Sequence, residues 1–223
     1  MPAARPRSDR PEDPKPSTSR VFRYVLLGLV FVGLVALAIL VLRRQPAPPL
    51  TTTRLAADPA LGNIHARVTI IEYGDFGCPT CRGWEQAGVR QHLIQAYGDQ
   101  VYFVWRDFPI INAQSPQAAE AGQCAFDQGK FWEYHDLLYQ HAPALSIADL
   151  KAYAVELGLD AAQFNHCLDS GQDTAKVAQS LQQARALGFN GTPSFLINGQ
   201  KLVGPASFNT FKSLIDAALA KAG

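Results

Sequence analysis

The segment Phe76-Gly77-Cys78-Pro79-Thr80-Cys81-Arg82 contains two cysteines with two residues between them, in a chain of 223 residues. It follows a strand-like run, Val68–Tyr73, and precedes a segment to about Tyr97 that we predict to be helical. Cys78 is therefore expected at a helix N-terminus, where unpaired N–H groups and the helix dipole lower the pKa of a thiol. Cys81 follows one turn later, close enough for a disulfide, and Pro79 suits the first helical turn. This pattern is typical of a redox-active pair.

The composition argues against several other kinds of protein. The chain has 20 Lys+Arg and 19 Asp+Glu, so its charge does not indicate nucleic-acid binding. Four cysteines are too few for a fold held together by disulfides, and no second pair at zinc-finger spacing accompanies the first. We therefore expect no metal site, and a redox reaction carried by the two cysteines would need no organic cofactor. If Cys78 pairs with Cys81, then Cys124 and Cys167 are left as a second pair or as two free thiols.

An unbroken apolar run, Tyr24–Leu42, distinguishes the N-terminal part of the chain. As a helix it would reach about 28 Å, close to the ~30 Å hydrocarbon core of a bilayer. We expect a single transmembrane anchor over residues 24–42. A cleaved signal peptide is the main alternative, since Ala36-Leu37-Ala38 has the form of a cleavage site, and a core helix of a soluble protein is another.

The segments on either side of this run are polar. Residues 1–23 are rich in Pro, Ser and Arg, and we predict a disordered cytoplasmic tail. Residues 43–57, with several prolines and a threonine run, predict a semi-extended linker. Basic residues before the run favour a cytoplasmic N-terminus, although others follow it. The cysteine chemistry agrees, because it puts the C-terminal domain outside the cytoplasm, where disulfides persist.

Residues 58–223 are predicted to form an α/β domain. Val68–Tyr73 is too apolar for an edge strand, so we expect it to be central. The helix after the cysteines, ending near Gly98, and a strand over Val101–Trp105 complete a βαβ unit. From Ser115 to Leu187 the apolar period is helical, which predicts an all-helical insertion over about residues 112–188.

Strand character returns after the insertion. Ser194–Ile197 and Lys201–Val203 flank Asn198-Gly199, which is a strong signal for a two-residue hairpin. Ser207 is expected to cap a final amphipathic helix. Helix N-caps are also expected within the insertion, at Ser115, at Ser146 in a capping box with Asp149, and at Asp160.

This order of elements resembles the DsbA-like form of the thioredoxin-like fold, in which a helical domain is inserted after the second strand. Five motifs match that group between about Asp58 and Lys221: Leu61-Gly62-Asn63, Asp75–Arg82, Arg106–Pro109, Phe131–Asp136 and Gly191–Phe195. Each motif alone is weak, but together and in this order they are specific. The resemblance implies an α/β thioredoxin-like fold with an inserted all-helical subdomain, and thiol–disulfide oxidoreductase activity.

The resemblance also implies roles for residues away from the cysteine pair. Thr192-Pro193 falls where this fold places a cis-proline, which would bind an extended substrate by strand addition; a trans proline opening a strand is the alternative. Glu72 corresponds to an acidic residue that would handle the proton of Cys81, unless it faces solvent. Cys124 and Cys167 would form a structural disulfide, or else pack as two buried thiols.

The implied reaction is disulfide donation to client proteins outside the cytoplasm. A thiolate of an unfolded or secreted client attacks Cys78, a second client thiol resolves the mixed disulfide, and a quinone-linked membrane oxidase reoxidises the pair. We expect Pro79 and Thr80 to tune the reactivity of Cys78. No dimerisation domain is recognisable, so we expect a monomer.

Two departures from the oxidase pattern keep other functions open. Thr80 stands where such oxidases usually have His, and Thr192 before the proline is commoner in isomerase-like relatives. A disulfide isomerase or a reductant on the same fold is therefore an alternative. A redox-inactive binding or chaperone module, in which the cysteines are structural, is another.

Overall fold

The computed structural model describes residues 18–43 and 57–221, which belong to two units. The first unit contains helix α1 (Thr18–Arg43), whose described large apolar side chains, such as Phe22 and Leu29, are exposed. Because α1 begins at Thr18, residues 18–23 are helical where we predicted a disordered tail. Residues 1–17 of that tail, and 44–56 of the predicted linker, lie outside the described residues. Within the part of the chain that is described, no helix combines the length and the apolarity needed to cross a membrane.

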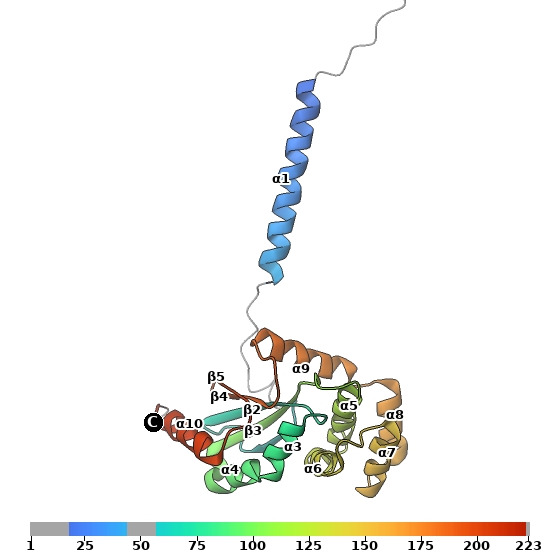
Figure 1. Cartoon of the computed structure of the whole chain (residues 1–223), viewed down its shortest axis with the longest axis vertical. Helices are drawn as coiled ribbons and strands as arrows, with labels where there is room; N and C mark the ends of the chain where they lie inside the picture. Colours follow the sequence, from blue (N-terminus) through green and yellow to red (C-terminus); the bar gives the residue numbers. More distant parts are fainter. Residues whose placement is uncertain (1–17, 44–56, 222–223) are drawn as a thin grey trace, which may run out of the picture. The chain divides into compact units, whose positions relative to one another are not determined.

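The second unit is built on a five-stranded sheet in the order β1-β3-β2-β4-β5 (Figure 1). Only β2 and β3 pair in parallel, and the other neighbours are antiparallel. β2 is the central strand, as its apolar run predicts. The strands are β1 (Ala60–Gly62), β2 (Val68–Gly74), β3 (Val101–Asp107), β4 (Ser194–Ile197) and β5 (Gln200–Val203).

The short strand β1 was not predicted, because three residues carry too little periodicity. It extends the sheet beyond β3, with Leu61 opposite Phe103. Gly62 ends it with a positive φ of 86°, and a Cβ there would lie 2.2 Å from the Val101 carbonyl oxygen. Only glycine therefore fits this position.

Helices cover both faces of the sheet. On one face α3 (Pro79–Gln86), α4 (Val89–Tyr97) and α10 (Phe208–Lys221) pack on the strands around Phe103 and Phe195 (Figure 1). On the other face α9 (Thr174–Ala186) packs against Tyr73 and Val104. Each large side chain buried in this way stabilises the fold by about 1.5–3 kcal/mol.

The helix predicted after the cysteine pair is in fact two helices. Gly88 separates α3 from α4 and adopts a left-handed conformation, with φ of 69°. The expectation of one continuous helix was wrong because an Ala87-Gly88 sequence permits this turn at little cost. A short 3₁₀ helix, η1 (Gly98–Gln100), then leads into β3.

The helical insertion has a core of its own, confirming the predicted thioredoxin-like fold with an inserted subdomain. It consists of α5 (Ser115–Phe126), α6 (Phe131–His141), α7 (Ile147–Glu156) and α8 (Ala161–Ser170), after which α9 returns to the sheet. The Ser146–Asp149 capping box and the Asp160 cap are present, as predicted. The predicted N-cap at Ser115 was wrong, because Ser115 is the first residue of α5. The N–H of Ser115 donates to the side-chain oxygen of Asn112 at 3.0 Å.

A disulfide joins the first and last helices of the four. Cys124 on α5 and Cys167 on α8 are bonded at an S–S distance of 2.00 Å. The same apolar cluster that surrounds this bond also includes Phe76, Cys78 and Cys81. The insertion therefore supplies part of the packing beneath the cysteine pair.

Candidate active site

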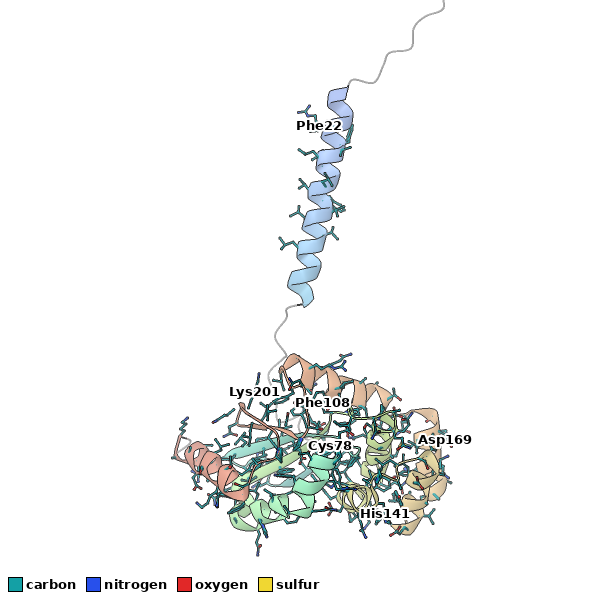
Figure 2. All side chains as sticks on the ribbon, in the orientation of Figure 1. Phe22, Cys78, Phe108, His141, Asp169 and Lys201 are labelled. Carbon is teal, nitrogen blue, oxygen red and sulfur yellow. A yellow bond between two sulfur atoms is a disulfide. The ribbon has the colours of Figure 1, made fainter. Side chains whose placement is uncertain are left out.

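Cys78 lies at the start of α3, where it is the N-cap residue (Figure 2). Its Sγ accepts a hydrogen bond from the Cys81 N–H at 3.2 Å, and its thiol, when protonated, donates to the Thr192 carbonyl at 3.4 Å. The interaction with the Cys81 side chain is the largest cause that lowers the pKa of Cys78 to about 6, with burial opposing it and Thr192 assisting. Much of Cys78 is therefore thiolate at neutral pH.

Cys81 has the opposite character. It is fully buried and is not bonded to Cys78 in this structure. Burial first, then Cys78 and the charge of Glu72, raise the pKa of the Cys81 thiol far above its ordinary value. One sulfur of the pair is thus an activated nucleophile, and the other needs a base before it can react.

The Thr192–Pro193 peptide bond faces Cys78 and is cis. The carbonyl of Pro193 is already occupied, because it accepts the N–H of Gly204 at 2.8 Å. Thr192 presents its own carbonyl to the Cys78 sulfur, and its buried Oγ1 has no hydrogen-bond partner among the described residues. A second cis bond, Ala142–Pro143, was not anticipated.

The loop before Cys78 is held by the buried carboxylate of Asp75. One oxygen accepts the N–H of Gly77 at 2.8 Å, and the other accepts those of Ile110 and Ile111 at 2.7 and 2.8 Å. The Asp75 carbonyl accepts the N–H of Cys78 at 3.0 Å. Asp75 therefore ties the redox loop to the segment after β3, while Pro79 and Thr80 remain exposed.

Glu72 is fully buried on β2, and neither carboxyl oxygen has a hydrogen-bond partner among the described residues. Side chains alternate along a strand, so Glu72 lies on the same face as Ile70, which is the face covered by α3 and α4. Burial, and then the charge of Glu85, raise the pKa of Glu72 well above its usual range. A carboxyl group whose pKa is raised in this way holds a proton more readily than an exposed one, which suits it to proton transfer with a neighbouring thiol.

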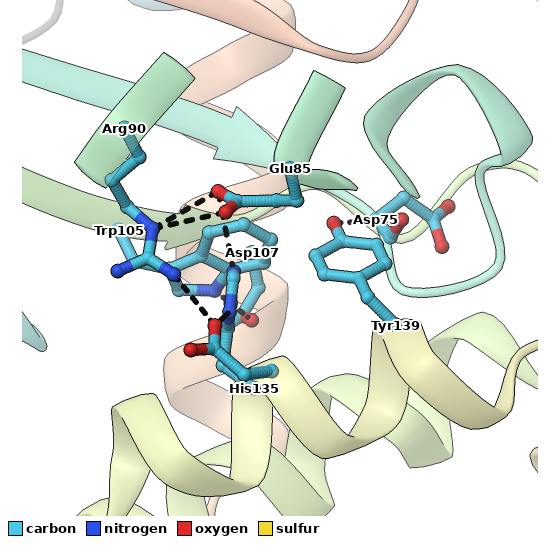
Figure 3. A network of polar contacts seen from close by, with 8 residues as sticks. Asp75, Glu85, Arg90, Trp105, Asp107, His135 and Tyr139 are labelled. Carbon is cyan, nitrogen blue, oxygen red and sulfur yellow. Dashed lines mark hydrogen bonds and ion pairs between the residues drawn. The ribbon is translucent and has the colours of Figure 1, made fainter. Parts of the chain in front are cut away.

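A polar network lies between the catalytic helix and the insertion (Figure 3), and its members Glu85 and Arg90 are electrostatic neighbours of Glu72. Arg90 on α4 donates to both oxygens of Glu85 at 3.1 Å and to Asp136 Oδ1 at 2.6 Å. His135 Nδ1 lies 2.8 Å from the same Asp136 oxygen. Ligand atoms of Glu85, His135 and Asp136 lie within 4.8 Å of one another, but the Arg90 guanidinium already supplies the cation between the carboxylates.

Sequence reasoning missed this network. The sequence does not single out Glu85 or Arg90, and His135 enters only as part of the Phe131–Asp136 motif. A signal did exist, because Glu85 stands four residues after Cys81 and so lies one turn further along the same helix face. For His135 no such signal exists, since only folding brings α6 against α3.

Comparison with known proteins places the chain in a family. The family model described as thioredoxin matches residues 55–217. The chain is similar to a thioredoxin-like oxidoreductase from Silicibacter pomeroyi DSS-3, with 33% identity, a TM-score of 0.67, and coverage of 74% of this chain and 93% of that one. It shares its fold with alpha-DsbA1 from Wolbachia pipientis, with 22% identity, a TM-score of 0.65, and coverage of 74% and 92%.

The curated relatives are of a different kind. A Na(+)/H(+) antiporter NhaA 3 from Salinispora tropica is 36% identical over 167 residues, which are 74% of this chain and 25% of the antiporter. The chain thus spans about a quarter of the length of the curated relatives it matches, so the match does not bring the activity of the whole antiporter with it.

The family match covers the sheet, the cysteine pair and the helical insertion together. The solved relatives share this fold over nearly their whole length. The chain therefore belongs to the thioredoxin family, with the inserted helical subdomain of the DsbA-like thiol–disulfide oxidoreductases.

Proposed function

We propose that this chain exchanges the Cys78–Cys81 disulfide with the thiols of client proteins, and that it acts as a disulfide donor. The observation that supports the proposal is the difference in pKa between the two cysteine thiols. Cys78 has a pKa of about 6, whereas burial raises the pKa of Cys81. A low-pKa sulfur is a good leaving group and stabilises the reduced form of the pair, which makes the disulfide oxidising.

The exchange balances in two steps. A client thiolate attacks Cys78 Sγ, the Cys78–Cys81 bond breaks, and Cys81 leaves with a proton supplied by Glu72. A second client thiolate then attacks the client sulfur of the mixed disulfide and releases Cys78 as a thiolate. The client loses two electrons and this chain gains them, so an oxidant must restore the pair, and we propose a quinone-linked membrane oxidase for that role.

We also propose that the exchange takes place outside the cytoplasm, with residues 24–42 as a single-span anchor and residues 1–23 inside. The support is the apolar run of the sequence, long enough for a bilayer, and the presence of a Cys124–Cys167 disulfide in the same chain as the redox pair.

A second candidate function, disulfide isomerase or reductant, differs from disulfide donor in the direction in which electrons flow. Thr80 is exposed and acts on Cys78 only through its backbone N–H, so the positive partial charge that a histidine would provide is missing. A thiolate with less support makes a weaker oxidant, which favours an isomerase or a reductant.

The decisive measurement is the reduction potential of the Cys78–Cys81 pair in the full-length protein, equilibrated with glutathione buffers. A value from about −120 to −180 mV is expected for a donor or an isomerase, and a value near −270 mV would indicate a reductant. Cys78→Ser is the control and should abolish both the titration and the oxidation of a reduced client. A pair without any reversible titration, or a Cys78→Ser variant with full activity, would refute the redox function and favour a binding module.

A further inference from the structure

Four ionisable side chains lie between Cys81 and the surface of α6, and each is an electrostatic neighbour or a contact of the next. Glu72, an electrostatic neighbour of Cys81, is fully buried, and Glu85 follows it with a side chain only 5% exposed. Asp136 ends the series with a side chain 54% exposed. Glu85 and Asp136 both line a surface groove of about 280 Å³, together with Gln86, Gln91, Tyr139 and Gln140.

His135 occupies the gap between the buried and the exposed end of this series (Figure 3). Burial opposes it, but the hydrogen bonds from His135 and Arg90 and the charge of Arg90 hold the pKa of Asp136 below its usual value, so Asp136 is a carboxylate. The Nδ1 of His135, 2.8 Å away, must then be the donor. Nε2 is left as the acceptor nitrogen.

That acceptor nitrogen is unused. Nε2 of His135 is buried, lies 3.9 Å from Glu85 Oε1, and has no hydrogen-bond partner among the residues described. The ring cannot turn away from Glu85 without a large rearrangement, because the rings of Trp105 and Tyr139 meet it nearly perpendicularly, each with a centroid 4.9 Å away. Buried polar atoms normally have a hydrogen-bond partner, so an unpartnered Nε2 that points toward Glu85 indicates a functional role for His135.

The charged and titratable groups that face His135 come from three helices. α3 contributes Glu85, α4 contributes Arg90, and α6 contributes Asp136 and Tyr139. The Tyr139 hydroxyl donates to the Asp75 carbonyl at 3.2 Å and so does not compete for Nε2. Arg90 binds Glu85 and Asp136 at once and thereby fixes the spacing on both sides of the imidazole.

We propose that His135, oriented by Asp136, carries the proton of thiol–disulfide exchange between the Glu72–Glu85 carboxyl pair and the surface groove. This proposal rests on the redox function proposed above. It makes His135 and Asp136 positioning and proton-relay residues, since neither contacts the reacting sulfurs.

The relay is defined by the step in which Cys81 attacks a mixed disulfide on Cys78. The Cys81 thiol gives its proton to Glu72, the Cys78–Cys81 bond forms, and the departing sulfur leaves as a thiolate. Because neither Glu72 oxygen has a hydrogen-bond partner in the resting structure, the relay requires the Glu72 side chain to turn toward Glu85. From Glu85 the proton passes to Nε2 of His135, while the Nδ1 proton leaves through Asp136 to water. When the disulfide is donated to a client, the same path supplies the proton that Cys81 takes up.

The test is a stopped-flow oxidation of the reduced full-length protein by oxidised glutathione. At saturating glutathione the rate reports the attack of Cys81 on the Cys78–glutathione disulfide. We expect His135→Gln and Asp136→Asn to slow this step by about tenfold or more at pH 7. The thiolate titration of Cys78 should be unchanged, which a general disruption of the site would not allow. His141→Gln, on the same helix and with a partly exposed side chain, is the matched control and should react like the parent.

The outcomes separate the relay from the redox function. If the parent forms and resolves the mixed disulfide but both variants resolve it equally fast, or if His141→Gln slows it as much, the relay is refuted. If His135→Gln does not fold, Asp136→Asn alone decides, because its side chain is half exposed. If the parent itself forms no mixed disulfide at Cys78, the redox function fails and the relay with it.

Discussion

Two sulfurs three residues apart differ because their surroundings differ. Cys78 caps a helix and receives an N–H, whereas Cys81 lies inside the helix among apolar side chains and beside the carboxyl of Glu72. Helix termini stabilise anions and burial destabilises them. The division between an attacking and a resolving cysteine therefore follows from position within one helical turn.

The lowered pKa of Cys78 predicts how the stability of the reduced protein depends on pH. The folded pKa is about 6 and the ordinary value is 9.0, so between these values the unfolded chain binds a proton that the folded chain does not. The free energy of unfolding of the reduced form should therefore rise from pH 6 to 9, by at most about 1.4 kcal/mol per pH unit. This contribution is lost as the pH falls through 6. Urea denaturation at several pH values measures it, and Cys78→Ser should lose the slope; an unchanged slope in that variant would contradict the assignment.

Apolar packing and a disulfide hold the helices of the insertion together, and a shared apolar cluster links them to the redox site. Apolar packing joins them around Tyr134 and Phe164, and the Cys124–Cys167 disulfide bonds α5 to α8. Because Phe76 and Cys81 belong to the same apolar cluster, loosening these helices would also loosen the base of the redox site.

We predict a large loss of stability when the Cys124–Cys167 disulfide is removed. The bond closes a loop with a sequence separation of 43 residues, for which the chain-entropy model gives about 4 kcal/mol. Cys124→Ser with Cys167→Ser, compared with the parent in oxidising buffer by chemical denaturation, measures the difference. A Cys78→Ser/Cys81→Ser variant is the control for loss of a disulfide elsewhere. Equal stability of the parent and the Cys124→Ser/Cys167→Ser variant would show that packing alone holds α5 to α8.

The whole chain combines a catalytic unit with a separate N-terminal unit that contains helix α1. All of the residues assigned to catalysis lie in the second unit. We propose that the first unit sets the location of the protein, because the apolar run Tyr24–Leu42 predicts a membrane anchor.

An anchored protein should sediment with membranes and resist extraction by alkaline carbonate. Placing two charges in the run, with Val30→Arg and Leu34→Arg, should release it into the soluble fraction, because each charge at the centre of a span costs about 2.5–3.5 kcal/mol. In intact spheroplasts a membrane-impermeant thiol reagent should label Cys78 of the reduced protein. A soluble product whose N-terminus follows Ala38 would instead show a cleaved signal peptide.

Local patterns were enough to predict most elements of the catalytic unit. The apolar run of β2, the Asn198-Gly199 hairpin and the capping box at Ser146 each depend on neighbours in sequence, and all three are present. The break at Gly88 and the strand β1 were missed, since a glycine turn and three paired residues acquire their meaning only from what they pack against.

The amino-acid sequence alone determined the order of the elements, the cysteine pair at a helix N-terminus and the family resemblance, because these properties are local or are encoded in short motifs. Only the tertiary structure decided the environment of each group. It buried Glu72 beside Cys81, brought Arg90 between Glu85 and Asp136, and aimed His135 at them from another helix. Burial and charge pairing depend on distances between residues far apart in the chain, and those distances exist only after the insertion has packed against the sheet.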